Sequence, residues 1–562
     1  ENVNFTEAAG TDFVLVVREK GGSSTVETTD WTIDDTGGNT TPTVTIADAG
    51  ANQVGGSASN PVIVGSWDVD NSNGTPGTLT LASNVELDDD VTVDASATLS
   101  LTSNATITGT VTNNGTVTLG GNTLTLDTAQ NISGTVDGGG GTIAGVNEVA
   151  QGDVLTVTGN LTLEGDLELD GEVAAQTGNV TVTGDVTLGT NGDGEISDGD
   201  AGSANSFDGS ITVEEGETLT LDGATQAPTL LGSLTVNGVS GGTGTVAAAN
   251  GGGNFGNNLD VTIVNENTSV TIAGVATGAT YNLTYEGDRD NDLTSGTHQE
   301  FQSSGIGDLT IATESHTVTV PTGGPHAIEG VLTVEEGQTL DLSSGGGQTL
   351  NLNDQGGRHT VNGDISGGTL NYNNNNITVE GDGETSIGSV SLSATATDAV
   401  LQDVKGVTGS LVVGNADNTF EVDSDTLRFS GATGDFDVHE DATFSTNAVT
   451  VFGDESSDVI TVDLGSGSDV HTLGETWVVG TVELDPSDLS IDGDLTVTDT
   501  GAIDEGSGAG ARIVAIVGSD VIIEDGGTLD DNNDLITLQL EAGGTLETAA
   551  NITLDGLTIG HS

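Results

Sequence analysis

The chain of 562 residues contains no cysteine and no methionine, and only seven of its residues are lysine or arginine. Without cysteine, the protein can form no disulfide bond, no thiolate metal site and no cysteine nucleophile. The absence of methionine has a different meaning, because a chain that begins at Glu1 without an initiator residue is typical of a mature product whose leader has been removed. We therefore expect the protein to be secreted and to act outside the cell or at its surface.

Aromatic residues and long apolar runs are also scarce. Aromatic side chains make up 3% of the chain, so a hydrophobic core must be built from aliphatic residues. The longest apolar runs, Phe13–Val17 and Ile513–Val517, have the length of a strand, whereas a membrane-spanning helix needs about 20 apolar residues. We expect no insertion into a membrane.

Positive charge is the scarcest feature of all, because 86 aspartate and glutamate residues leave a formal net charge of -79. Such a surface repels nucleic acids and anionic membranes, so neither is an expected partner. Copies of the chain also repel one another unless concentrated salt, with a Debye length of about 3 Å at 1 M, or bound cations screen the charge. Halophilic or cation-rich extracellular surroundings would provide that screening.

What the sequence has in abundance is a short repeat with a period of two. Three six-residue units follow one another at Leu155–Asn160, Leu161–Asp166 and Leu167–Glu172, each with aliphatic residues at positions i and i+2. Residues two apart point to the same face of a strand, and the Gly-Asn or Gly-Asp pairs favour the positive φ of a corner. Longer copies at Gly209–Leu221 and Gly330–Leu342 indicate a repeat architecture.

This pattern predicts an all-β fold, a parallel β-helix or β-solenoid that forms a rod. A string of β-sandwich domains is the alternative, although its hairpin turns would not produce short strand-corner-strand copies. Disorder is disfavoured by the sustained alternation. The recurrence of Phe420, Phe436 and Phe452 at equal intervals predicts a coil of that length, with stacked rings.

Composition divides the chain into four segments. Residues 1–67, where aromatic and basic residues gather, are expected to form an N-terminal cap or assembly segment. Residues 68–250 and 327–562 are expected to be β-solenoid. The range 251–326 departs from the repeat rhythm and is interpreted as an irregular insertion or a bend.

One stretch, Leu464–Leu473, has a Gly-x-Gly-x-Asp-x-aliphatic spacing that resembles the nonapeptide calcium repeats of secreted β-roll toxins and proteases. The resemblance implies that carbonyls of Gly465 and Gly467 and the carboxylates of Asp469 and Asp458 coordinate Ca²⁺, the expected cofactor. The alternative is an acidic corner without an ion. Two further acidic clusters, at residues 191–200 and 288–292, are interpreted as solvated corners rather than calcium loops.

No catalytic motif is recognisable, and we predict neither catalytic residues nor enzyme activity. The histidines lack metal-binding spacing, and no nucleophile elbow is present. A polysaccharide lyase or hydrolase on a β-helix remains an alternative, because paired carboxylates for glycoside hydrolysis have no sequence signature.

The units Gly493–Val497 (Gly-Asp-Leu-Thr-Val) and Gly367–Leu370 (Gly-Gly-Thr-Leu) are examples of the short repeats in this chain. In this repeat style it resembles secreted β-solenoid surface proteins, namely filamentous haemagglutinin-like adhesins and autotransporter passengers. The resemblance implies a solenoid fold at the cell surface, and carries over no binding residue.

These observations favour an extracellular structural subunit that assembles head-to-tail with copies of itself into a filament, sheath or surface layer. The alternative is an adhesin or carbohydrate-binding protein with extracellular polysaccharide as its partner. Strand addition between copies is expected to use the apolar residues of the N-terminal segment, although that segment can instead cap its own solenoid. The residues concerned are Val3, Phe5, Phe13, Val14, Leu15, Val16 and Val17.

Overall fold

A computed structural model shows an all-β protein, about 1% helical, in which parallel coils stack into a β-solenoid of about 16 turns over the described residues. The predicted fold class is therefore confirmed. The residues that the structure describes are 14–15, 27–33, 43–46, 56–57, 60–69, 78–81, 85–87, 90–188, 194–197, 206–214, 216–223, 227–238, 244–249, 253–265, 271–273, 275–276, 280–287, 291–292, 301, 304–312, 317–323, 325–393, 396–464, 471–484, 489–505, 512–515, 520–530, 537–540, 545–548 and 556–559.

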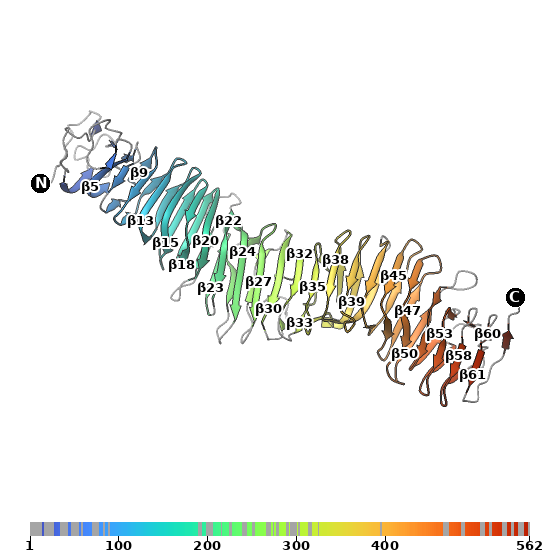
Figure 1. The fold of residues 1–562 in the computed structure, drawn as a ribbon. Coiled ribbons are helices and arrows are strands. Elements are labelled where there is room, and N and C mark those ends of the chain that lie inside the picture. The colour runs from blue at the N-terminus through green and yellow to red at the C-terminus, as the bar shows by residue number, and fades with distance from the viewer. Residues whose placement is uncertain are drawn as a thin grey trace. The chain divides into compact units, whose positions relative to one another are not determined.

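The chain divides into two compact units, Glu1–Ala279 and Thr280–Ser562. Figure 1 shows the strands of each unit following one another as rungs. Helical structure includes one short 3-10 turn, Ser344–Gly346. Within the described part of the chain, no helix is long and apolar enough to cross a membrane.

In the first unit, each coil contributes one strand to a parallel sheet of twelve. In spatial order its strands are β1 (Val14–Leu15), β3 (Thr43–Ile46), β6 (Thr78–Leu81), β9 (Thr98–Leu101), β12 (Thr116–Thr118), β14 (Gly134–Asp137), β16 (Val154–Thr158), β19 (Glu172–Thr177), β21 (Gly194–Ser197), β23 (Thr218–Asp222), β25 (Thr245–Ala249) and β28 (Thr271–Ala273).

The other walls of the first unit are built in the same way. Their strands include β7 (Val85–Leu87), β10 (Ala105–Ile107), β13 (Thr123–Asn131), β15 (Gly141–Val149), β17 (Leu161–Glu164), β18 (Leu167–Leu169), β20 (Asn179–Thr187), β22 (Ser206–Val213), β24 (Thr229–Gly238) and β27 (Asp260–Asn265). Thr78 pairs with Thr98 and Thr98 with Thr116, so successive coils contain 20 and then 18 residues.

The core of the first unit consists of aliphatic columns, as the period-two pattern predicts. Leu79, Leu99, Val117, Val136 and Val157 are register partners on successive coils, and each is at most 1% exposed. Burying one such side chain stabilises a fold by about 1.5–3 kcal/mol. Because each column runs through consecutive coils, every coil is held mainly by its two neighbours.

The outward positions of the same sheet form two columns in which eight of ten residues are threonine. One column is Thr78, Thr98, Thr116, Thr135 and Thr156, and the other is Thr80, Ser100, Thr118, Asp137 and Thr158. Threonine suits an outward strand position, because its branched side chain packs on the pleat and its hydroxyl stays polar. This threonine face carries a single charged side chain on a chain of net charge -79.

The second unit repeats the architecture with longer coils. Its strands include β35 (Leu332–Val334), β38 (Arg358–Val361), β40 (Thr378–Glu380), β45 (Thr419–Asp423), β48 (Thr443–Thr446), β46 (Thr426–Phe429), β49 (Val449–Phe452), β52 (Thr476–Val478), β55 (Leu495–Val497), β58 (Asp520–Ile523) and β61 (Thr545–Thr548).

The expected coil interval between Phe420, Phe436 and Phe452 is wrong, although the rings of Phe436 and Phe452 do contact each other, with centroids 6.2 Å apart. Phe420 is in register with Phe444 and stacks on it with ring centroids 6.4 Å apart. Phe452 is in register with Phe429, 5.5 Å away. The coils here hold 24 and 23 residues, so the equal spacing in sequence places the rings on different strands.

Candidate functional site

The residues of the predicted calcium site lie mainly outside the described residues. Gly465, Gly467 and Asp469 are not described, and the calcium site they would form stays a prediction. Asp458 is described, and it lies in the turn before β50 (Val459–Asp463) with an exposed fraction of 3%.

Hydrogen bonds account for the buried carboxylate of Asp458. Its Oδ2 accepts the backbone N–H of Asp454 at 2.9 Å. Burial on its own raises the pKa of Asp458, but hydrogen bonds from Asp454, Gly431 and Glu455 outweigh it and hold the pKa below its usual value. The ionised carboxylate therefore closes a corner of the second unit.

The predicted assembly segment is described only at Val14 and Leu15, which form β1. These two residues pair in parallel with Thr43 and Val44 of β3 in the same chain. Val3, Phe5, Phe13, Val16 and Val17 lie outside the described residues.

The first unit contains an open pocket of about 380 Å³ whose lining is strongly acidic. Four of its eight lining residues are carboxylates and none is basic; the lining residues are Gln151, Gly152, Asp153, Val154, Asp170, Gly171, Glu172 and Glu195. We call it the acidic pocket. Neither the sequence repeats nor any motif indicated it.

Three successive coils build the acidic pocket. Val154 at the start of β16 is in register with Glu172 at the start of β19, and Glu172 is in register with Glu195 of β21. Asp170 and Gly171 form the corner between β18 and β19, where both backbone N–H groups donate to the carbonyl of Val149. Gly171 is required there, because a Cβ atom would lie 2.4 Å from the carbonyl oxygen of Ala150.

Two carboxylates of the acidic pocket have hydrogen-bond partners. Ser197 donates its hydroxyl to Oε1 of Glu172 at 2.5 Å, and Asn131 donates its amide to Oδ2 of Asp153 at 2.6 Å. Burial raises the pKa of Glu195, and the neighbouring charges of Glu172 and Asp222 raise it further.

Asp170 stands apart from the other lining carboxylates. It is 8% exposed, and its Oδ1 has no hydrogen-bond partner among the described residues. A buried carboxylate oxygen without a donor is costly, and each such group in a native structure needs a physical explanation.

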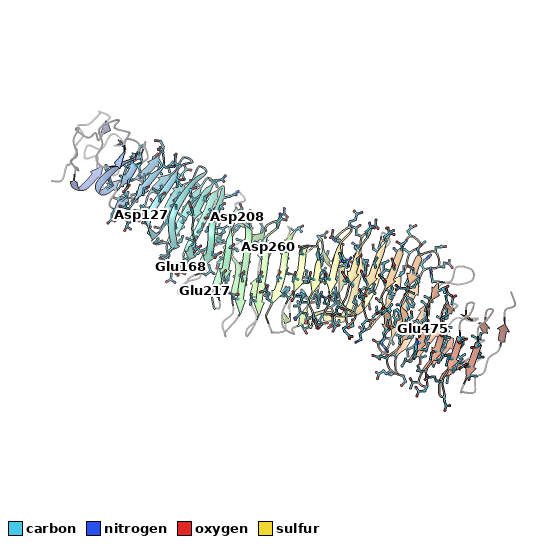
Figure 2. All side chains as sticks on the ribbon, viewed as in Figure 1. Asp127, Glu168, Asp208, Glu217, Asp260 and Glu475 are labelled. Atoms are coloured by element: carbon cyan, nitrogen blue, oxygen red, sulfur yellow. The ribbon has the colours of Figure 1, made fainter. Side chains whose placement is uncertain are left out.

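The acidic surroundings continue to the next described corner, at Glu214–Glu217. Burial raises the pKa of Glu217 to about 7. A hydrogen bond from the backbone of Glu214 lowers this pKa, whereas the negative charges of Glu214, Asp170 and Glu168 raise it. Figure 2 labels Glu168 and Glu217 on the same edge of the first unit. At neutral pH this edge therefore holds carboxyl groups close enough to oppose one another's ionisation.

The sequence drew attention to one member of the acidic pocket, through the cluster at residues 191–200. Of its acidic residues, Glu195 is described, whereas Asp193, Asp198 and Asp200 are not. Within the described ranges, no group of three or more acidic or histidine side chains could hold a metal ion.

In the second unit, scarce basic residues link neighbouring coils. Lys405 Nζ lies 2.5 Å from Oε2 of Glu384, and Arg358 Nη2 lies 2.5 Å from Oε2 of Glu380. Each pair joins residues 21 or 22 apart in sequence, on adjacent coils. Exposed ion pairs contribute about 0–1 kcal/mol, so they help to fix the register rather than supply the stability.

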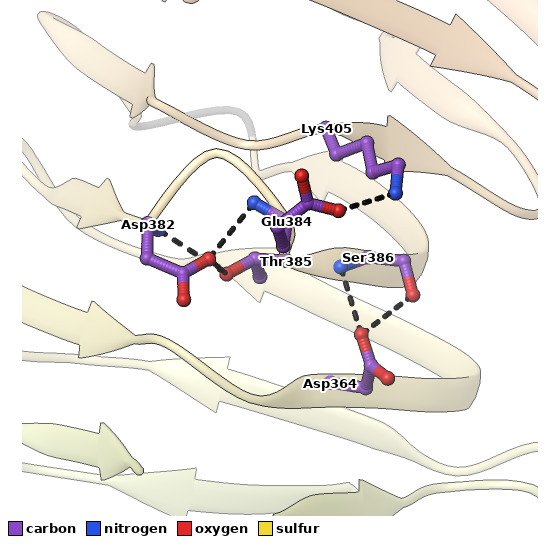
Figure 3. A network of polar contacts seen from close by, with 6 residues as sticks. All are labelled: Asp364, Asp382, Glu384, Thr385, Ser386 and Lys405. Atoms are coloured by element: carbon purple, nitrogen blue, oxygen red, sulfur yellow. Dashed lines mark hydrogen bonds and ion pairs between the residues drawn. The ribbon is translucent and has the colours of Figure 1, made fainter. Parts of the chain in front are cut away.

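Figure 3 shows the polar network around the first of these ion pairs. Asp382 accepts the backbone N–H of Glu384 at 2.9 Å and the hydroxyl of Thr385 at 3.2 Å. Asp364, one coil earlier, accepts both the backbone N–H and the hydroxyl of Ser386, at 2.9 and 2.7 Å. The network thus spans three coils and links each of them to the next.

No protein-family model, curated protein or solved structure matches this chain. The architecture is a β-solenoid, which is consistent with the resemblance to β-solenoid surface proteins. What the chain does must therefore be argued from its own residues.

Proposed function

We propose that the protein is an extracellular structural subunit that joins copies of itself end to end into a filament, a sheath or a surface layer. The supporting observation is the in-register parallel pairing that carries each coil onto the next. Because every coil presents the same kind of backbone edge and aliphatic interior, the pairing that joins coils within one molecule can join coils of two molecules.

The inward column of the second unit becomes less buried toward its later coils. In the column Leu495, Val521 and Leu546, the first two are 0% exposed, whereas Leu546 of β61 is only half-buried. Strand β62 (Gly556–Ile559) follows and pairs with β60. In the proposed filament, contact with a second copy would bury the side chain of Leu546.

Head-to-tail contacts of this kind generate open filaments when the rotation between copies does not close a ring. The threonine face provides a nearly uncharged surface along which such filaments can lie side by side. Elsewhere the charge of -79 opposes contact, so we place assembly in concentrated salt or in cation-rich surroundings outside the cell.

The experiment that tests this function is negative-stain microscopy of the purified full chain in molar salt. We expect filaments from the native chain, and folded monomers from Leu546→Lys, which places a charge in the inward apolar column. Glu547→Lys is the matched control, because it changes the adjacent outward residue of the same strand and should leave filaments intact. Native protein that stays monomeric at every salt concentration contradicts the proposal.

Deleting residues 1–20 tests which segment joins the copies. If the segment is a donor strand that pairs with a second copy, its deletion should give folded monomers. If it caps its own solenoid, its deletion should unfold the first coils. Truncated chains that still form filaments of normal length would place the joint elsewhere.

One observation favours the alternative of carbohydrate binding. Trp477 of β52 is 40% exposed on an outward strand face, and its indole N–H donates to Glu475 at 2.8 Å, which orients the ring. Exposed aromatic rings on flat surfaces stack on sugars. If this alternative holds, soluble glucans or xylans should quench the Trp477 fluorescence, and Trp477→Ala should abolish retention on the insoluble polymers.

A further inference from the structure

We propose that the threonine face of the first unit binds the surface of ice crystals. This function goes beyond end-to-end assembly, because a single molecule has everything that it requires. It rests on three properties of the face, namely its regular spacing, its rigid backing and its lack of charge.

Backbone register makes the two columns of the threonine face regular. Strands β6, β9, β12, β14 and β16 pair in parallel along these columns without a register shift. β3 extends both columns by one coil, and its Thr43 pairs with Thr78. Among the described pairs of this sheet, the first register shift lies between β16 and β19, where Ala174 stands opposite Thr156. The face is therefore periodic from β3 to β16.

The parallel sheet fixes the two distances at which the threonine face repeats. Neighbouring strands lie about 4.8 Å apart, and residues two positions apart on one strand are about 6.6 Å apart. The hydroxyl and methyl groups of the face therefore lie on a nearly rectangular grid of these dimensions. Oxygen atoms on the prism faces of ice repeat at similar distances along two perpendicular directions.

The side chains of the threonine face are held in place. Beneath them lie aliphatic residues such as Leu79, Leu99 and Val117, each at most 1% exposed, which fix the backbone. The branched Cβ of threonine restricts rotation about χ1, and all ten side chains of the face are half-buried. One hydroxyl binds ice no more tightly than it binds liquid water, but a fixed array binds at many points at once, because each contact holds the others in position.

The charge of the threonine face matches an uncharged ligand. Asp137 is the one charged side chain in its two columns, on a chain with 86 acidic residues. The adjacent wall of the same coils differs, because one of its outward columns loses the threonine pattern and ends in a glutamate. That column is Thr106, Thr125, Ala144 and Glu164.

Two other occupants fit the threonine face less well. Between two single molecules, five coils and two columns cover about 24 Å by about 10 Å, or roughly 240 Å², whereas each partner in a stable protein interface buries about 800 Å². Surfaces that bind sugars usually present aromatic rings for stacking, and neither column contains one. In a filament every copy repeats the face, so ice and a neighbouring filament would compete for it.

Binding at this face would have a measurable effect on ice. Molecules fixed to a crystal surface force the ice between them to grow with a curved front, which lowers the temperature at which growth continues. They also prevent large crystals from growing at the expense of small ones. Neither effect needs a filament or a further ligand.

Partition into growing ice tests the proposal with the purified full chain in dilute salt, where its charge keeps single copies apart. Ice is grown slowly into the solution, and the protein in the ice is compared with the protein left in the liquid. We expect the native chain to enter the ice and to inhibit recrystallisation, because a growing crystal rejects an unbound protein. Thr116→Lys, in the middle of the face, should reduce the partition about tenfold or more, because its long charged side chain keeps the ice away from the neighbouring threonines.

Thr125→Lys is the matched control, because it makes the same change at a half-buried outward threonine of the adjacent wall. It should partition as the native chain does. Thr98→Lys, one coil before Thr116 in the same column, repeats the test with a second variant, and melting temperatures show whether each variant is folded.

The proposal is overturned if ice excludes the native chain, or if Thr116→Lys and Thr125→Lys reduce the partition equally. Native chains that ice excludes, but that pair through the threonine face in light scattering, would assign the face to a second copy. Exclusion from ice together with retention on cellulose or chitin that Thr116→Lys abolishes would assign it to a polysaccharide.

Discussion

The backbone N–H of Leu332 donates a hydrogen bond of 3.0 Å to Nδ1 of His359, which lies 27 residues later on the next coil. The imidazole is 0% exposed, and because Nδ1 accepts, the proton must sit on Nε2. Nε2 has no hydrogen-bond partner among the described residues. The neutral ring thus satisfies one backbone group of the core and leaves its own N–H unsatisfied.

This arrangement predicts a loss of stability in mild acid. Burial lowers the pKa of His359 to about 4, from a usual value of 6.5. Below pH 6.5 the unfolded chain binds a proton that the folded chain refuses, so the free energy of unfolding should fall by about 3 kcal/mol as the pH drops from 6.5 to 4. Urea midpoints across this range measure the effect.

The variant His359→Asn isolates this contribution, because its amide oxygen can still accept the Leu332 N–H and does not titrate. Relative to the native chain, its unfolding free energy should depend less on pH between 6.5 and 4. His439→Asn, which removes a histidine outside the core, should keep the native pH dependence. An equal slope in the native chain and His359→Asn would contradict the prediction.

Glu217 should have the opposite pH dependence in the first unit. Its folded pKa of about 7 lies above the usual value of 4.5, chiefly because of burial. The stability it gives is complete below pH 4.5 and is lost as the pH rises towards 7, because the unfolded chain then releases a proton that the folded chain keeps. The loss should be at most about 3 kcal/mol, and smaller in salt.

The protein contains an internal control for Glu217. The sequence copy Gly330–Leu342 has Gln338 at the matching position, 2% exposed, with its backbone N–H bonded to Glu335 as that of Glu217 is to Glu214. Glu217→Gln should stabilise the chain at pH 8 and not at pH 4. Gln338→Glu should introduce the same pH-dependent destabilisation into the second unit. Urea melts at both pH values would refute the idea if the two variants showed no pH dependence relative to the native chain.

The sequence predicted the fold because alternation is local. The apolar residues of Leu155–Asn160 and its neighbours occupy inward positions, and period two alone fixes which residues those are. Coil length is different, because it depends on how many residues each corner takes up. For that reason the interval between Phe420 and Phe436 was misread as a coil.

The acidic pocket could not be predicted for the same reason. Glu172 lies opposite Glu195 because the intervening coil holds 23 residues, whereas the coil before it, from Val154 to Glu172, holds 18. No sequence period marks this difference. A signal was present only in the acidic run that contains Glu195, and it pointed to a single member of the pocket.

Buried corner amides are a second feature that alternation does not reveal. Asn418 is 0% exposed, and its Nδ2 donates to the carbonyls of Ser393 and Ala396 on the preceding coil at 2.7 and 3.0 Å. Its Oδ1 accepts the backbone N–H of Asn415 at 3.2 Å. The side chain thus satisfies three backbone groups at one corner of the second unit.

Asn418→Ala should therefore destabilise the chain strongly. It leaves the carbonyl of Ala396 and the N–H of Asn415 without this partner, at roughly 1–3 kcal/mol each, whereas the carbonyl of Ser393 keeps the N–H of Ala396, so we expect a loss of about 2 kcal/mol or more in urea unfolding. Asn415→Ala, three residues earlier and half-buried, should cost less than about 1 kcal/mol. Equal losses in the two variants would show that the Asn418 hydrogen bonds do not hold this corner.

The charge of the whole chain leads to the last prediction, which concerns salt. Carboxylates on adjacent coils are only about 4.8 Å apart along a column, and seven basic residues cannot neutralise 86 acidic ones. At 0.01 M salt the Debye length is about 30 Å, so many coils repel one another, whereas at 1 M it is about 3 Å and only direct neighbours do. The melting temperature should therefore rise by several degrees between these two concentrations in the presence of a chelator. The unfolded chain also repels itself, but its charges are farther apart, so screening favours the folded state.

KCl and NaCl should act alike if screening is the cause, and a rise confined to one salt would indicate specific ion binding instead. Identical melting temperatures at about 0.01 M and about 1 M salt would show that the stacked carboxylates do not limit stability.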